Sequence, residues 1–163
     1  MMTNRQRMIS IMVTGTMLAI GTSAAFAATH PIVGTWQLNL AKSTDESTAP
    51  PPKSETFVFA ESAKGFSLAT TIVGADGKAT VTKGEPVQWD GMAHPESTNP
   101  DHDSVTVKQV GARTIEWAFH LKGALVRSGT LTVSRDGKTM TVSGASVSAK
   151  GGKVYFNDIF DRK

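Results

Sequence analysis

The 163-residue sequence contains no cysteine. This absence excludes thiol nucleophiles, CxxC redox motifs and thiolate metal sites. It also excludes a lipid anchor attached at a cysteine. Small secreted domains often depend on disulfides, so an exported form of this chain must be held together by packing alone.

A strong charge of one sign is also missing once the N-terminus is set aside. Residues 1–27 contain two of the 17 basic residues and none of the 14 acidic ones, so the remainder has 15 basic and 14 acidic residues and a net charge of +1. No basic run interleaved with aromatic residues occurs in that remainder. We therefore do not expect nucleic acid as a partner.

The N-terminus has the three parts of a secretory signal peptide. Arg5 and Arg7 form a basic start, and residues 8–20 (MISIMVTGTMLAI) are almost continuously apolar. Residues 25–27 (AFA) then supply small side chains at both positions of an A-x-A cleavage site. The apolar run is shorter than the roughly 20 residues that a membrane-spanning helix needs.

We therefore expect residues 1–27 to be cleaved and the mature protein to be periplasmic or secreted, without a transmembrane anchor. Residues 28–163 are long enough for one domain with its own core. The oligomeric state is left open.

Helical periodicity is absent from these residues, and period-two alternation takes its place. The clearest case is TIEWAFHLK (114–122), in which the alternating apolar residues are Ile115, Trp117, Phe119 and Leu121. A strand places all four on one face, whereas a helix would distribute them around its circumference. His120 falls on the other face.

Short glycine-containing turns separate the alternating segments. ADGK (75–78) and RDGK (135–138) carry Asp-Gly, a strong signal for a hairpin. Strands joined in this way form a meander, and we count about eight or nine of them. The sequence therefore predicts an all-β, antiparallel up-and-down meander. Closure into a barrel would remove its exposed edges, and a two-sheet sandwich is the alternative.

The first predicted strand, GTWQLNLAKS (34–43), resembles the opening of calycin-superfamily chains, which include lipocalins and fatty-acid-binding proteins. The resemblance implies a lipocalin-like barrel whose floor is formed by Gly34 and Trp36, with Arg162 near the last strand packed across the tryptophan ring. A guanidinium can stack on such a ring.

A narrower resemblance is to small secreted bacterial lipocalin-like proteins with the pattern GTW-x-LN-x-x-KS. The dipeptide Asp-Gly after Trp89 and the NPD of residues 99–101 fit that group. The sequence departs from lipocalins in lacking a cysteine pair and a C-terminal helix. It departs from fatty-acid-binding proteins in lacking their helix pair, so only the floor residues are carried over.

Four residues are candidates for ligand binding. Trp117 and Phe119 share the apolar face of their strand, and Trp89 directly precedes the long connection 90–103, which could place it near a barrel entrance. Arg127 falls in register with apolar neighbours, including Leu125, and could recognise an anionic head group. The alternative is that the register slips and Arg127 faces water.

Catalytic and metal-binding signals are weak. His94 and His102 occur with acidic residues in the 90–103 connection but match no standard ligand spacing, and a solvated polar loop is the alternative. No G-x-S-x-G motif occurs. Asp158 and Asp161 are three residues apart on a strand and therefore point to opposite faces. We expect no metal, no cofactor and no enzymatic activity.

The sequence favours a non-catalytic protein that binds a small apolar ligand inside the barrel. The alternative is a protein-interaction or envelope-stress module with a filled core, which would use its surface or the 90–103 loop. The two differ in whether the barrel interior contains a cavity.

Overall fold

The computed structural model describes residues 29–63, 65–148 and 150–163, and the predicted signal peptide lies outside these residues. Eleven strands and no helix occur in the described residues. Accordingly, none of these residues forms a helix that is long and apolar enough to cross a membrane. The strands are β1 (Gly34–Leu38), β2 (Thr44–Asp45), β3 (Ser54–Ser62), β4 (Gly65–Val73), β5 (Ala79–Lys83), β6 (Asp90–Pro95), β7 (Ser104–Gly111), β8 (Thr114–Leu121), β9 (Ala124–Val133), β10 (Thr139–Val147) and β11 (Lys153–Arg162).

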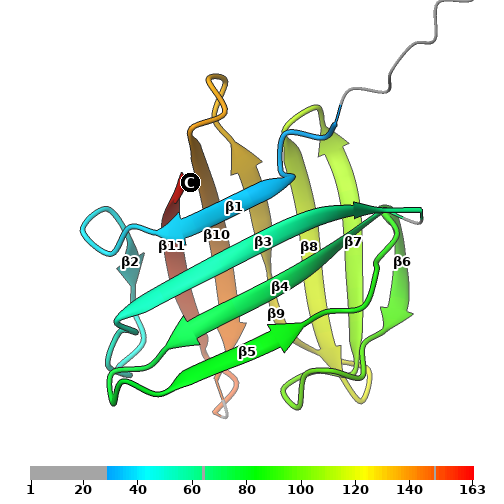
Figure 1. Ribbon diagram of the computed structural model, residues 1–163. Helices are drawn as coiled ribbons and strands as arrows, with labels where there is room; N and C mark the ends of the chain where they lie inside the picture. The colour runs from blue at the N-terminus through cyan, green and yellow to red at the C-terminus, as the bar shows by residue number, and fades with distance from the viewer. Residues whose placement is uncertain (1–28, 64, 149) are drawn as a thin grey trace, which may run out of the picture.

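The strands form one antiparallel sheet in the order β5-β4-β3-β1-β11-β10-β9-β8-β7-β6, and β2 pairs with β11. Pairing of the first strand with the last curls the sheet. In Figure 1, β1, β3, β4 and β5 form a front layer that crosses β6–β11 behind it. The predicted all-β antiparallel meander is confirmed, with eleven strands instead of eight or nine, and the sheet curls toward a barrel without closing between β5 and β6.

One end of the barrel is closed by Trp36 and Arg162. Trp36 is completely buried, and its indole Nε1 donates a hydrogen bond to the carbonyl of Ile32 (2.7 Å). The Arg162 guanidinium lies 4.0 Å from the centroid of the Trp36 ring, which is a cation–π contact. The two residues are register partners on β1 and β11.

Arg162 also forms hydrogen bonds with the surrounding backbone. Its guanidinium donates hydrogen bonds to the carbonyls of Pro31, Val33 (2.9 Å) and Gly137 (2.6 Å). Gly34 has a φ of +137°, and a Cβ at this position would overlap Arg162 Nη1. Only glycine therefore lets the backbone pass beside the guanidinium. The three residues predicted for the floor lie together in the structure.

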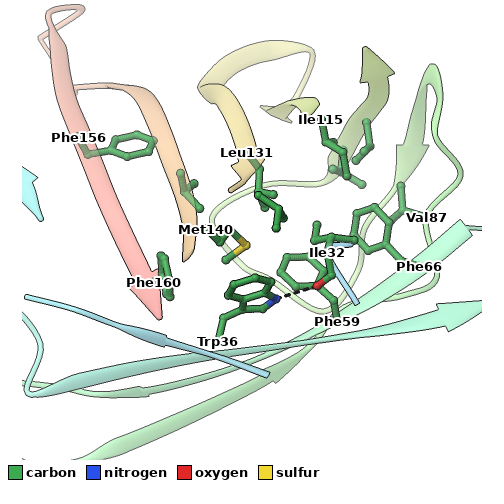
Figure 2. Packing of buried hydrophobic residues seen from close by; sticks show 14 residues of the cluster. Ile32, Trp36, Phe59, Phe66, Val87, Ile115, Leu131, Met140, Phe156 and Phe160 are labelled. Atoms are coloured by element: carbon green, nitrogen blue, oxygen red, sulfur yellow. Dashed lines mark hydrogen bonds between the residues drawn. The ribbon is translucent and has the colours of Figure 1, made fainter. Parts of the chain in front are cut away.

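Buried apolar side chains gather next to this closed end. Figure 2 shows Met140, Phe160, Phe59 and Ile32 around the Trp36 ring. They come from β10, β11, β3 and the segment before β1, so the cluster joins both layers. The closed end is therefore the well-packed part of the domain.

The sheet is not hydrogen-bonded all the way round, because the described residues show no ladder between β5 and β6. The segment after β5 continues along β4 instead: Gly84 N donates to Leu68 O (2.8 Å), and Val87 and Phe66 exchange two backbone bonds. Side chains cross the seam, since Ser97 Oγ donates to Glu85 Oε1 (2.8 Å).

The structure corrects one expectation about the connection that follows Trp89. Residues 90–103 do not form a single loop, because Asp90–Pro95 is β6 and pairs with β7. The true connection is 96–103. It lies at the end of the barrel opposite Trp36, together with the β4–β5, β8–β9 and β10–β11 turns, and we call this the open end.

We predict that Arg162→Met destabilises the protein by about 3 kcal/mol, because it removes charge-assisted hydrogen bonds to three backbone carbonyls as well as the cation–π contact. Urea unfolding measures the change. Arg135→Met, which alters an exposed arginine in the turn after β9, is the matched control and should change stability by less than about 0.5 kcal/mol. Equal effects of the two substitutions would contradict the role of Arg162.

Candidate ligand-binding site

A cavity of about 270 Å³ lies between the two layers of the barrel and extends from the core cluster to the open end. Its walls are largely apolar and aromatic. The phenylalanine and tryptophan side chains that line it are Phe57, Phe59, Phe66, Trp117, Phe119 and Phe160. A cavity of about 150 Å³ already holds benzene in a protein core, so this interior has room for a somewhat larger molecule.

Four carboxylates line this cavity, and two of them, Glu55 and Asp158, lie on strands among its aromatic side chains. Glu55, Phe57 and Phe59 occupy alternate positions on β3, so their side chains lie on the same face of the strand. All three line the cavity. Asp158 lies in the same way between the buried Phe156 and Phe160 on β11. Strand alternation therefore directs both carboxylates inward.

Sequence reasoning missed both carboxylates, although the signal was available. Asp158 was weighed only against Asp161, and the two do point to opposite faces: Asp161 pairs outside with Lys42 (3.5 Å) and Asn39 (2.6 Å). An acidic residue in register with two phenylalanines was the informative feature. Glu55 has the same relation to the phenylalanines of β3.

Arg127 on β9 also lines the cavity. Its guanidinium lies 4.2 Å from the centroid of the Phe156 ring and 5.8 Å from that of Trp117. Its Nε is buried and has no hydrogen-bond partner among the described residues. The cation is thus held against aromatic faces rather than in an ion pair.

The register predicted for this strand is wrong at one point. A bulge between the pairs Phe119–Arg127 and His120–Leu125 leaves one extra residue, Val126, in β9. The slip turns Leu125 out, where it is 44% exposed, while Arg127 stays inward. A slip was considered as a reason for Arg127 to face water, but it displaces Leu125 instead.

Burial changes the acidity of the two inward carboxyl groups. Desolvation, aided by the nearby Asp158 charge, raises the pKa of Glu55 to about 7, although Arg127 opposes the shift. Desolvation also raises the pKa of Asp158, with Arg127 opposing and Asp45 contributing. Both shifts arise because a charged carboxylate loses water inside the barrel.

The 96–103 connection folds over the open end. Glu96, Thr98, Asn99 and His102 from this segment line the cavity. Glu96 and His102 are each only 8% exposed. The His102 ring stacks on Phe119 with centroids 4.1 Å apart, and burial lowers the pKa of its imidazole. The connection therefore forms part of the cavity wall.

Trp89 lies at the closed end of the barrel. It packs against His30 (centroids 4.4 Å apart) and Phe66 (5.3 Å), and it does not belong to the cavity lining. The prediction that it stands at an entrance is wrong. The chain pairs along β4 through Val87 and reaches the closed end before β6 begins.

The four predicted ligand-binding residues therefore separate into two groups. Trp117, Phe119 and Arg127 line one cavity, whereas Trp89 belongs to the packing near the floor. The histidines of the 90–103 segment also separate, since His94 bonds Asp90 (2.9 Å) on the surface side of β6. Within the described ranges, no group of three or more acidic or histidine side chains could hold a metal ion.

Comparison with known proteins supports the fold. No protein-family model and no curated protein matches the sequence. The crystal structure of zebrafish ileal bile acid-binding protein complexed with cholic acid matches 82% of this chain and 99% of its own, with a TM-score of 0.50 and 9% identity. At this identity the match shows that the two chains are alike in fold. The siderocalin Ex-FABP matches 82% of this chain and 74% of its own, with a TM-score of 0.39 and 8% identity.

The raised pKa of Glu55 predicts a pH-dependent stability difference between the wild type and Glu55→Gln. The folded carboxyl group holds its proton up to about pH 7, whereas the unfolded one loses it near 4.5. The stability of the wild type relative to the variant should therefore fall as the pH rises from about 4.5 to 7, by up to about 3 kcal/mol, and then level off. Urea unfolding across this range measures it; a flat difference would contradict the burial of the charge.

Proposed function

We propose that this protein is a non-catalytic binding protein that holds a small, largely apolar ligand inside its barrel. The observation that carries the proposal is the cavity of about 270 Å³ with aromatic and aliphatic walls. Apolar walls gain free energy when a ligand displaces water from them, about 25 cal/mol per Å² of apolar surface buried. A filled core would have favoured the interaction or envelope-stress module instead.

Two further observations support the proposal. A structural neighbour with the same fold is a bile acid-binding protein that was crystallised with cholic acid. The described cavity wall also offers no hydroxyl group hydrogen-bonded to a histidine, which is the arrangement of a serine- or threonine-type nucleophile. His120, on the other face of β8, lies outside the lining.

We predict that filling the cavity abolishes binding of the neutral, environment-sensitive dye Nile red. Thr70→Trp places a large ring in the cavity, because Thr70 lines it, whereas the adjacent Thr71 lies on the outer face of β4. Fluorescence titration should show at least tenfold weaker binding for Thr70→Trp and a change of less than about twofold for the control Thr71→Trp.

Circular dichroism and thermal unfolding verify that both variants fold. Absence of a dye signal with the wild type, or equal binding by the two tryptophan variants, would overturn the proposed function.

We also propose export to the periplasm or beyond, on the basis of the N-terminal sequence. Expression of the full chain in a Gram-negative host should yield a protein that begins at Ala28 in the periplasmic fraction, as measured by intact mass. Ala27→Arg should block cleavage, because the A-x-A site requires a small side chain there. Full-length wild-type protein in the cytoplasm would contradict export.

A further inference from the structure

Building on the proposed function, we propose that the cavity selects amphiphiles with a cationic amine head group over those of equal apolar size that end in a carboxylate. The geometry that points to this preference is the set of charged side chains lining the cavity. The acidic members are Glu55, Glu85, Glu96 and Asp158, and the basic member is Arg127. Burial lowers the pKa of His102, which favours its neutral form.

The inward carboxylates have unused capacity for hydrogen bonds. Neither Glu55 nor Asp158 accepts a hydrogen bond through its side chain, or forms an ion pair within 4 Å, among the described residues. Ionised carboxylates are acceptors only. Their natural complement in a ligand is therefore a donor, and best a charged one.

Arg127 does not reverse this balance. Its guanidinium is held on the rings of Phe156 and Trp117, and its Nε is enclosed by protein atoms. With Glu55 and Asp158 ionised, the three side chains together carry one negative charge. A cationic head group neutralises that charge, whereas a carboxylate head group would add a second one in a poorly solvated space.

The other charged groups that line the cavity or act on Asp158 are also acidic. Asp45 on β2 acts on Asp158, and the Glu85 and Glu96 carboxylates are engaged by Ser97 and Thr98 on the seam side. Because Glu55 titrates near neutral pH, a cationic ligand favours its ionised form. Affinity for an amine should therefore rise between pH 6 and pH 8, and affinity for a carboxylate should fall.

The test compares three probes with the same tail: octylamine, octan-1-ol and octanoate. Displacement of Nile red measures their affinities at pH 6 and pH 8. At pH 8 octylamine should bind at least tenfold more tightly than octanoate and more tightly than octan-1-ol. Glu55→Gln and Asp158→Asn should each reduce the preference for octylamine over octan-1-ol at least fivefold.

Glu61→Gln is the matched control, because Glu61 lies on the same strand as Glu55 but is exposed and outside the cavity. It should leave the preference unchanged. If octan-1-ol binds but octanoate binds as tightly as octylamine at pH 8, the head-group inference is wrong and the proposed function stands. If neither octan-1-ol nor Nile red binds, the proposed function fails, and the inference fails with it.

Discussion

Trp36 on the first strand and Arg162 on the last strand are in contact, and the closed end of the barrel depends on this contact. The guanidinium covers the indole ring and bonds carbonyls before β1 and in the β9–β10 turn. A chain without cysteine has no covalent link to perform this task. Gly34 is part of the same arrangement, since any side chain there would displace the guanidinium.

Tight packing at the closed end determines where free space remains. The fully buried residues Trp36, Met140 and Phe160 fill the region between the layers near the floor. Toward the open end the layers are lined by shorter or charged side chains, such as Thr70 and Asp158, and these leave the cavity. The seam between β5 and β6 adds to this opening, because no backbone ladder draws its two sides together.

The sequence predicted those parts of the structure that depend on local pattern. Alternation in β8 placed Trp117 and Phe119 on the inner face, and the Asp-Gly turns marked hairpins. β6 was missed because it is short, carries Gly91 and Pro95, and shows no apolar alternation. Its existence is set by pairing with β7, which only the assembled sheet provides.

The site was harder to predict because its residues meet across distant strands. The three charged groups come from β3, β9 and β11, and nothing in the sequence brings these strands together. The face on which Leu125 lies relative to Arg127 also depends on a bulge in β9, and the local sequence does not predict this bulge. The position of Trp89 was predicted wrongly for the same kind of reason. Residues 84–87 run along β4 and carry the chain to the closed end of the barrel, where Trp89 lies.

The inward carboxylates work against the stability of the empty barrel. Burial raises the pKa of both Glu55 and Asp158, which means that their ionised forms lose free energy on folding. Apolar or amide side chains of similar size would pack on the same strands without that penalty. A domain held together by packing alone tolerates such groups at a cost, and costs of this kind concentrate at functional sites. A ligand that offers hydrogen-bond donors and positive charge would remove the penalty, so the same residues that weaken the empty protein would strengthen the occupied one.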